Sequence, residues 1–178
     1  MQSVWTKLSS EVSYATPRIT VGRDQVRRPD GSTGPYEWVE APDQVRVGAI
    51  VDDGLLFTSQ NHYLVGHTLQ LPGGNVESDE DPRVCAQREL HEETGYYGGT
   101  WHLRGGLCPL PGLSSMRVYL WSARDLHLGE AHRESAERDL RVVRLSFAEA
   151  VRAVQDGRVN CLASTTLVLI LARSADDT

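Results

Sequence analysis

The chain has 178 residues, of which 40% are hydrophobic and 24% charged, and its formal net charge is -6. This length and composition fit one globular domain, or one domain with an elaborated edge, whose core needs no disulfide staple. The negative charge argues against a general nucleic-acid-binding protein, which usually presents a basic surface. A nucleotide substrate stays possible, because bound divalent cations reverse the local charge of an acidic site.

Residues 18–41 have the pattern of a β-hairpin. Strand-like runs at about Ile19–Val26 and Tyr36–Glu40 flank a segment, 29–35, that is rich in glycine, proline and other turn residues. We expect this hairpin to belong to an N-terminal extension over residues 1–41 that precedes the main domain, 42–178.

Further strands are predicted along the main domain. Asp52-Asp53-Gly54 lies between two apolar runs and is a strong hairpin signal. The strands expected from these and later runs are 45–51, 55–59, 68–71, 101–107, 117–123 and 140–145.

Three helices are predicted. The first spans about 82–94, since Asp81 suits the N-cap, Pro82 the first helical position and Gly95 the left-handed residue past the end. The second begins at the capping-box sequence Ser146-Phe147-Ala148-Glu149 and ends at Gly157. The third, about Leu162 to Arg173, is apolar on most faces and is expected to be largely buried. Strands, a helix, more strands and then helices predict an α+β sandwich with a mixed sheet.

Glu89, Glu92 and Glu93 are spaced so that they approach one face of the first helix. Their like charges repel each other, and a hard cation with oxygen ligands would remove that penalty. Arg88 lies four residues before Glu92 and can pair with it. Taken alone, the three glutamates would favour the alternative of a solvated acidic face, since charge runs usually face solvent.

The segment before this helix adds backbone freedom and another carboxylate. Gly73 and Gly74 let the backbone come close to a metal or a phosphate without side-chain obstruction. Glu80 lies just before the predicted N-cap. The glycines, the arginine and the carboxylates at these fixed spacings together form a more specific sequence signal than any one of these residues does alone.

The whole segment resembles the signature of the Nudix hydrolases. That signature is glycine, five residues, glutamate, seven residues, and then arginine, glutamate, an aliphatic residue, any residue, two glutamates, any residue, glycine and a hydrophobic residue. It is filled here by Gly74, Glu80, Arg88, Glu89, Leu90, Glu92, Glu93, Gly95 and Tyr96.

The resemblance implies an α/β/α sandwich and a metal-dependent pyrophosphohydrolase. Glu89 and Glu93 would ligate Mg²⁺ or Mn²⁺ with Glu92 assisting, and the Gly73 carbonyl would be a further ligand. Arg88 would orient the acidic face, and Glu80 would support the loop or a water. Metal ions neutralise diphosphate charge and activate water, which fits this chemistry.

Outside the signature the chain resembles the ADP-ribose pyrophosphatases, in which an N-terminal extension helps to form a dimer. We therefore expect a homodimer. Gln60 follows an aliphatic strand, and Pro111-Gly112 lies close to where a proline marks ADP-ribose hydrolases. These residues and Gly74 are candidate substrate contacts. Trp38 could stack on the base, although a core or dimer contact is an open alternative for it.

Two positions depart from that branch. The branch often has an arginine shortly after the glutamine, where this chain has Asn61-His62-Tyr63. It often has glutamate before the leucine of the glycine loop, where this chain has Gln70. Both changes affect expected substrate contacts.

The catalytic base is expected on an acidic segment after the signature, which holds Glu130, Glu134 and Glu137. Glu137 is the first choice and Glu134 the second, and a solvated loop is the alternative. If neither acts, Glu80 or Glu92 would have to accept the proton.

Three functions stay open. The first is hydrolysis of ADP-ribose to AMP and ribose 5-phosphate. The second is hydrolysis of another nucleotide sugar, a dinucleoside polyphosphate, an oxidised nucleotide or capped RNA. The third is a non-catalytic nucleotide-binding domain, although no carboxylate of the signature is missing. A nucleic-acid partner is not expected.

The location expected from the sequence is the cytoplasm. Cys85, Cys108 and Cys161 are too far apart to suggest a disulfide framework or a metal site. The N-terminus lacks the apolar core of a signal peptide. No apolar run is long enough to span a bilayer.

Overall fold

The computed structural model describes residues 4–131 and 139–176. Their contacts divide the chain into two compact units. Unit 1 comprises Met1–Pro42 and Cys108–Arg117, and unit 2 comprises Asp43–Leu107 and Val118–Thr178. The segment 108–117 thus packs with the N-terminal residues, although it follows a strand of unit 2.

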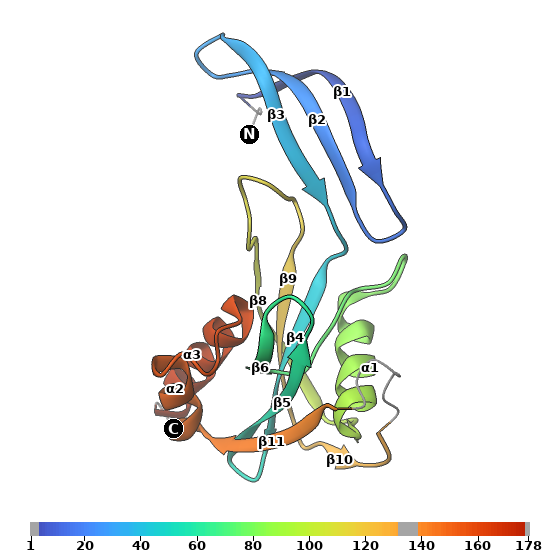
Figure 1. The fold of residues 1–178 in the computed structure, drawn as a ribbon. Coiled ribbons are helices and arrows are strands. Elements are labelled where there is room, and N and C mark those ends of the chain that lie inside the picture. The colour runs from blue at the N-terminus through green and yellow to red at the C-terminus, as the bar shows by residue number, and fades with distance from the viewer. Residues whose placement is uncertain (1–3, 132–138, 177–178) are drawn as a thin grey trace. The chain divides into compact units, whose positions relative to one another are not determined.

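Unit 1 is built on an antiparallel sheet in the order β1-β2-β3 (Figure 1). The strands are β1 (Thr6–Ala15), β2 (Thr20–Arg27) and β3 (Thr33–Glu40). The predicted hairpin is therefore present as β2 and β3. Its turn is shorter than expected, because Arg28 N–H donates to the Ser32 carbonyl at 2.8 Å and β3 already begins at Thr33.

Strand β1 was not expected from the sequence. Its pairing with β2 is irregular between Lys7 and Ser9 and again between Val12 and Tyr14. Only Leu8, Val12 and Tyr14 are large apolar residues among its ten, and Ser10 interrupts their alternation, so the sequence signal for a strand is weak. All ten residues of β1 are exposed.

Unit 2 contains a six-stranded mixed sheet in the order β11-β5-β4-β9-β8, with β6 paired to β5. Strands β4 and β9 are parallel, and the other pairs are antiparallel. The strands are β4 (Gln44–Val51), β5 (Gly54–His62), β6 (Gly66–Gln70), β8 (Thr100–Leu107), β9 (Val118–Arg124) and β11 (Arg141–Ser146). A separate short pair is formed by β7 (Tyr96–Tyr97) and β10 (His127–Leu128).

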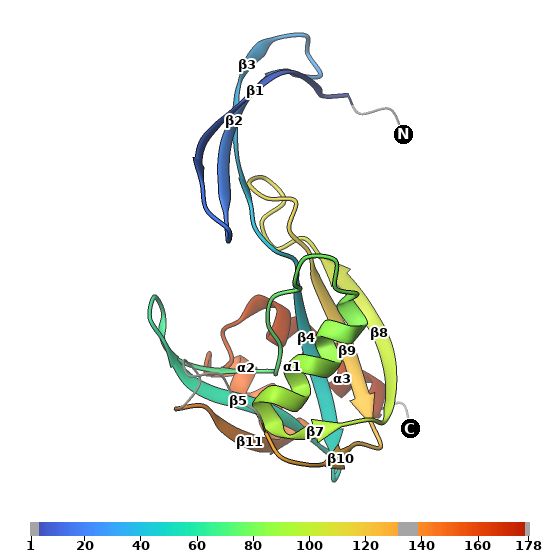
Figure 2. The same cartoon turned by 90° about the vertical axis from the view of Figure 1, so that its right-hand side faces the viewer.

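The helices of unit 2 cover both faces of this sheet. Helix α1 (Pro82–Thr94) lies on one side, and α2 (Phe147–Gln155) and α3 (Leu162–Asp176) lie on the other (Figures 1 and 2). The α+β prediction, an α/β/α sandwich with a mixed sheet, is confirmed.

Alternation along β4 explains the two layers. Val45, Val47 and Ala49 belong to the buried cluster that includes Cys85, Ala86 and Leu90 of α1. Gly48 faces the other layer, where a Cβ atom would overlap the side chain of Leu171 on α3. The missing side chain lets α3 approach the sheet closely.

The expected limits of α1 are confirmed. The Asp81 carboxylate accepts hydrogen bonds from Arg83 N–H at 2.8 Å and Val84 N–H at 3.4 Å. Pro82 begins the helix, and Gly95 ends it with a left-handed φ of 79°. The capping box of Ser146 and Glu149 at the start of α2 is also present.

The expectation for α3 was partly wrong. The helix covers the predicted residues, but its burial is confined to one face. Leu167 and Leu171 are buried, whereas Leu162 is 58% and Leu169 47% exposed. In the described part of the chain, no helix combines the length and apolarity needed to cross a membrane.

Candidate active site

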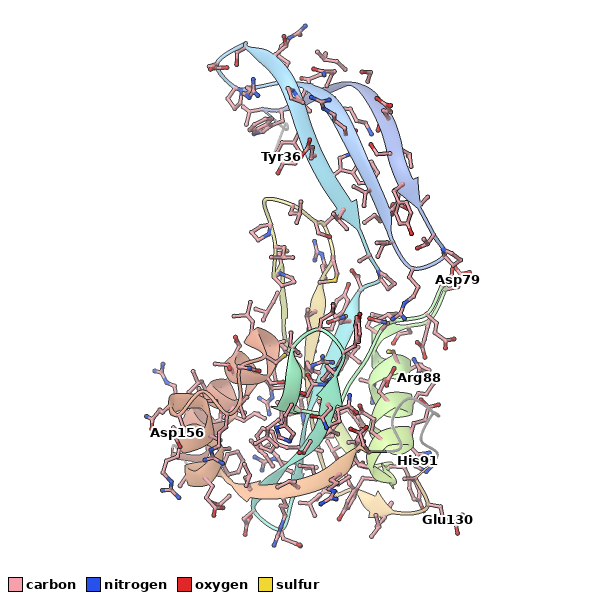
Figure 3. All side chains as sticks on the ribbon, in the orientation of Figure 1. Tyr36, Asp79, Arg88, His91, Glu130 and Asp156 are labelled. Carbon is pink, nitrogen blue, oxygen red and sulfur yellow. The ribbon has the colours of Figure 1, made fainter. Side chains whose placement is uncertain are left out.

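Arg88 links three carboxylates of the acidic segment. Its guanidinium binds the Glu80 carboxylate through Nε at 2.9 Å and Nη2 at 3.0 Å. Its Nη1 atom binds Glu89 and Glu92, each at 3.0 Å. The predicted pair with Glu92 is therefore one of three ion pairs. Figure 3 shows Arg88 on α1, with His91 further along the same helix.

The pairing with Arg88 controls the ionisation of Glu80. Two hydrogen bonds from the guanidinium lower the pKa of the Glu80 carboxyl from 4.5 to about 2, although partial burial opposes the shift. A second oxygen contact, from Glu77 N–H to Glu80 Oε2 at 3.0 Å, ties the loop to the same carboxylate. The hydrogen bond with Glu80 likewise raises the pKa of Arg88. Glu80 is thus an ionised residue that positions the loop and Arg88.

Glu93 joins the helix to the glycine loop. It is only 3% exposed, and its Oε2 atom accepts a hydrogen bond from Gly73 N–H at 2.9 Å. Gly73 has a φ of 142°, and a Cβ atom there would overlap the Val45 carbonyl. Glycine is therefore required for the loop to reach Glu93.

Gly74 makes room for a second carboxylate. A Cβ atom at Gly74 would overlap the carboxylate of Glu89, so the glycine leaves a space that this carboxylate occupies. The loop is held against β4 on either side of Gly73. Val45 N–H donates to the Gly74 carbonyl at 3.0 Å, and Val47 N–H donates to the Pro72 carbonyl at 2.8 Å.

This site fits a divalent cation by donor chemistry. Carboxylate oxygens from Glu80, Glu89, Glu92 and Glu93 outnumber the single guanidinium of Arg88, and hard cations prefer such oxygen ligands. Within residues 4–131 and 139–176, no three His, Cys, Asp or Glu side chains are arranged together as a ligand set. The bonds to Arg88 and Gly73 explain this, because they direct the carboxylates to protein donors.

The two departures from the ADP-ribose pyrophosphatase pattern contact each other. The His62 Nε2 atom lies 3.2 Å from the Gln70 amide nitrogen and 3.1 Å from that of Gln60. Among the residues that the structure describes, the buried Gln60 Oε1 atom and the cross-strand Thr68 hydroxyl have no hydrogen-bond partner. The sequence identified His62 only as part of a departure from the branch, and the contact with Gln70 was not predicted because it depends on the β5–β6 pairing.

Unit 1 brings together the other expected substrate contacts. Trp38 and Pro111 line a pocket of about 420 Å³ with Tyr36 of β3 (Figure 3), and the Tyr36 hydroxyl donates to the Gly112 carbonyl at 2.8 Å. The Trp38 indole N–H donates to Asp24 at 2.8 Å, which fixes the ring at the pocket wall.

Two expected catalytic residues, Glu134 and Glu137, lie outside the described residues. Glu130 is described and exposed. The chain just before this segment contacts the end of the helix, since Gly129 N–H donates to the Gly95 carbonyl at 2.9 Å. Just after it, Asp139 accepts a hydrogen bond from Asn61 N–H of β5 at 3.1 Å.

Comparison with known proteins matches residues 42–158 to the NUDIX domain. The chain belongs to the Nudix family. Residues 5–39 of this Nudix protein match a second family, the nucleoside diphosphate sugar hydrolase N-terminal domain. The protein is therefore a pyrophosphohydrolase of nucleoside diphosphate compounds.

Individual relatives agree with this assignment. An ADP-ribose pyrophosphatase of Mycobacterium tuberculosis is 35% identical over 85% of this chain and 75% of its own length. A methanol dehydrogenase activator of Bacillus methanolicus is 30% identical over 86% of this chain and 88% of its own. The solved structure of an ADP compounds hydrolase superposes with a TM-score of 0.85 over 97% of this Nudix chain and 95% of its own, at 21% identity, and supports the fold.

Proposed function

We propose that the protein hydrolyses ADP-ribose to AMP and ribose 5-phosphate with Mg²⁺ or Mn²⁺. The observation that carries the proposal is the acidic cluster of Glu80, Glu89, Glu92 and Glu93 around Arg88 and the glycine loop. The 35% identity with an ADP-ribose pyrophosphatase supports the choice of substrate. The absence of a described disulfide among Cys85, Cys108 and Cys161 is compatible with a cytoplasmic location.

Glu89, Glu92, Glu93 and the Gly73 carbonyl would hold the cation. When bound, a divalent cation neutralises diphosphate charge and activates the attacking water. Glu93 is already held by Gly73 N–H, and Glu89 fits the space beside Gly74. These contacts fix the two carboxylates before a ligand arrives, so little reorganisation is needed during the reaction.

Arg88 and Glu80 act as positioning residues. Arg88 contacts Glu89 and Glu92 directly and Glu80 through two bonds, so it sets the direction of all three carboxylates. Because the pKa of Glu80 is lowered to about 2, this carboxylate is a weak proton acceptor at neutral pH. Its role is to hold Arg88 and the loop.

Another carboxylate must then accept the proton of the attacking water. Glu137 is our first choice and Glu134 our second, as the sequence indicates. Among the described residues, Glu92 is the alternative, because its side chain is 33% exposed and that of Glu89 only 13%.

The pocket of unit 1 is the proposed contact for the nucleobase. The Trp38 indole is held by Asp24, and a Cβ atom at Gly22 would overlap its ring. A fixed aromatic plane beside Pro111 suits a flat nucleobase, since a base of any identity can stack on an aromatic ring. Gly112 would act indirectly, through the hydrogen bond from Tyr36.

We also propose a homodimer through the sheet of unit 1. Every residue of β1 is exposed, including Val12 and Tyr14, each at 57%. An exposed strand with unpaired backbone groups and apolar side chains is a ready surface for another chain. A second copy of this sheet would cover it.

A different diphosphate substrate is the second candidate, and the His62–Gln70 contact favours it. Where the ADP-ribose branch often has arginine and glutamate, this chain has an imidazole next to two amides. Amide and imidazole groups would select another substrate group than an arginine and a glutamate would, because buried polar atoms discriminate against ligands that leave them unpaired.

The test is a panel of ADP-ribose, other nucleotide sugars, dinucleoside polyphosphates, oxidised nucleotides and capped RNA, each with Mg²⁺ and with Mn²⁺. We expect ADP-ribose to have the highest kcat/KM, with AMP and ribose 5-phosphate as products. Excess chelator should abolish turnover, and either cation should restore it. Turnover that persists in chelator would contradict the metal mechanism, and a better substrate would favour the second candidate.

A further inference from the structure

The glycine loop pairs with β4 through an incomplete ladder. The two segments run antiparallel, with an isolated bridge between Gln44 and Asn75. Next to this bridge, Val45 N–H donates to the Gly74 carbonyl at 3.0 Å. In an antiparallel ladder, a pair in this register exchanges two hydrogen bonds. The return bond, from Gly74 N–H to the Val45 carbonyl, is absent among the backbone bonds of the described residues. The ladder is therefore interrupted at the peptide between Gly73 and Gly74.

Arg46 supplies the donor that the Val45 carbonyl does not receive from the loop. The Arg46 Nη1 atom donates to this carbonyl at 2.9 Å, and the arginine is only 9% exposed. The same carbonyl lies against the loop backbone, because a Cβ atom at Gly73 would overlap its oxygen. The guanidinium thus satisfies a buried acceptor for which the register would otherwise require a loop amide.

Stability alone does not explain an arginine at this position. Among the described residues, the buried Nε atom of Arg46 has no hydrogen-bond partner. In the same part of the chain, Arg46 forms no ion pair with a carboxylate. An unpaired buried donor and an uncompensated buried charge both cost free energy, and apolar residues of similar volume are often at least as stabilising. This cost indicates a role other than packing.

The interrupted peptide carries a group of the proposed metal site. The Gly73 carbonyl and the Gly74 N–H belong to one planar unit, so they point in opposite directions and turn together. A bond from Gly74 N–H to the Val45 carbonyl would turn this unit and redirect the Gly73 carbonyl. On the other side of the same residue, Gly73 N–H donates to Glu93 at 2.9 Å. The φ of 142° at Gly73 is favourable only for glycine, so the sequence permits the unusual turn of the loop.

We propose that Arg46 is a positioning residue for the metal site. By satisfying the Val45 carbonyl, its guanidinium keeps the Gly73–Gly74 peptide out of the β4 ladder and thereby sets the direction of the Gly73 carbonyl. Without Arg46, the buried Val45 carbonyl would lack a donor, and Gly74 N–H, its partner in the register, would supply one. The effect on the cation rests on the proposed function, in which the Gly73 carbonyl is a ligand, whereas the effect on the peptide does not.

The first experiment measures amide hydrogen exchange by NMR on the full chain in the presence of chelator. In the wild type, Gly74 N–H should be less protected than Val45 N–H, which is bonded to the loop. Arg46→Met is similar in length and cannot donate, so it should slow exchange at Gly74 as the ladder closes. Arg46→Lys keeps a donor and should leave Gly74 weakly protected.

Two results of this experiment would overturn the proposal. One is a Gly74 N–H that is as protected as Val45 N–H in the wild type, because the ladder would then be complete. The other is unchanged exchange at Gly74 in a folded Arg46→Met variant. The wild-type comparison decides the matter even if Arg46→Met does not fold.

The second experiment measures Mn²⁺ affinity by electron paramagnetic resonance without substrate. Arg46→Met should weaken binding roughly 10-fold, within the range for loss of a contact that orients a metal ligand, and Arg46→Lys should retain most of the affinity. Arg144→Met is the matched control, because Arg144 Nη1 also donates to a backbone carbonyl, that of Asp52 at 3.1 Å, outside the glycine loop. This control should bind Mn²⁺ as the wild type does. Equal affinity in the wild type and Arg46→Met would refute the role of Arg46 in the metal site.

Urea unfolding in chelator separates positioning from a purely structural role. Arg46→Met removes an unpaired buried charge, so the urea midpoint should not fall. A lower midpoint together with weaker Mn²⁺ binding and unchanged exchange at Gly74 would show that Arg46 only supports the fold. If the wild type binds no Mn²⁺ and hydrolyses no substrate, the proposed function fails, and the exchange rates at Gly74 still decide whether Arg46 holds the peptide.

Discussion

Unit 2 surrounds its charges with a packed core, whereas unit 1 has hardly any core. In the described part of unit 1, only Gly22 and Val26 are buried. Unit 2 has a buried cluster between α1 and strands β4, β5, β8 and β9, and it also buries the Glu93 carboxylate, which is 3% exposed. A small sheet without a hydrophobic face is marginal in water. This contrast fits our proposals that unit 2 carries the reaction chemistry and that unit 1 serves contacts with substrate and with another chain.

Glu93→Gln is the sharpest test of the proposal that unit 2 carries the reaction chemistry. The amide keeps the shape and removes a ligand charge, so kcat should fall by more than the roughly 10–100-fold typical for loss of an outer-shell partner. Repulsion with Glu89 is relieved, so the fold should persist without metal. Steady-state kinetics and thermal unfolding measure the two effects. Glu77→Gln, an exposed change on the preceding loop, is the matched control and should retain activity. Normal kcat in a folded Glu93→Gln variant would show that Glu93 is not a ligand.

The second test concerns the proton acceptor. Glu137→Gln should lower kcat by about 10²-fold, the usual scale for loss of a general base, with little change in KM. Glu134→Gln is the matched comparison and should have a smaller effect. A large loss of kcat in the Glu134 variant alone would show that Glu134, and not Glu137, is the general base. If neither change matters, Glu92 is the remaining described candidate and its variant should be measured next.

The local features of α1 could be predicted from the sequence because they depend on near neighbours. Asp81, Pro82 and Gly95 determine the limits of the helix, and the spacing of Arg88 and Glu92 determines one ion pair. The further pair between Arg88 and Glu80 bends back across eight residues and depends on the loop path. Sequence spacing alone could not give that path.

Features that depend on tertiary packing could not be predicted in the same way. Strand β1 was missed because only three of its ten residues, Leu8, Val12 and Tyr14, are large and apolar, so its alternation is too sparse to identify a strand. Apolar residues around α3 suggested burial on most faces, yet only one face meets the sheet. The contact of His62 with Gln70 joins two strands, so it has no spacing that a sequence motif could reveal.

The third test concerns the substrate half of the contrast. If Trp38 stacks on the base, Trp38→Leu should raise KM for the preferred substrate about 10-fold, within the range of roughly 1–3 kcal/mol per stacked base. The kcat should change little, because the carboxylates of α1 are untouched. Trp5→Leu is the control, since Trp5 contacts the edge of Tyr36, with ring centroids 5.8 Å apart, and does not belong to the lining of the pocket as described. Equal KM in the wild type and the Trp38 variant would favour a structural role for this residue.

The charges of unit 2 should also leave a signature in stability. Glu80 has a pKa of about 2 in the folded chain and about 4.5 without its partner, so its stabilising effect is present above pH 4.5 and is lost as the pH falls toward 2. Glu80→Gln should therefore lower the free energy of unfolding by about 2–3 kcal/mol at pH 7 and by much less at pH 3. Urea unfolding of both proteins at the two pH values measures the difference. A gap that is the same at pH 7 and pH 3 would show that the ion pair with Arg88 contributes nothing to stability.

The mildest change tests whether unit 1 depends on a second chain. If two copies of the sheet pack together, Val12→Lys should weaken the dimer, because it removes an apolar contact and adds a charge at a surface that becomes buried. Ser13→Lys adds the same charge without removing an apolar side chain and separates the two causes. Sedimentation at micromolar concentration should give a dimer for the wild type and a larger monomer fraction for Val12→Lys. The intrinsic metal dependence should not change, since the acidic helix belongs to unit 2. If the wild type is a monomer at that concentration, β1 is exposed to solvent in the wild type and in the variant alike, and the proposed dimer is contradicted. The missing core of unit 1 would then need another explanation than dimer formation.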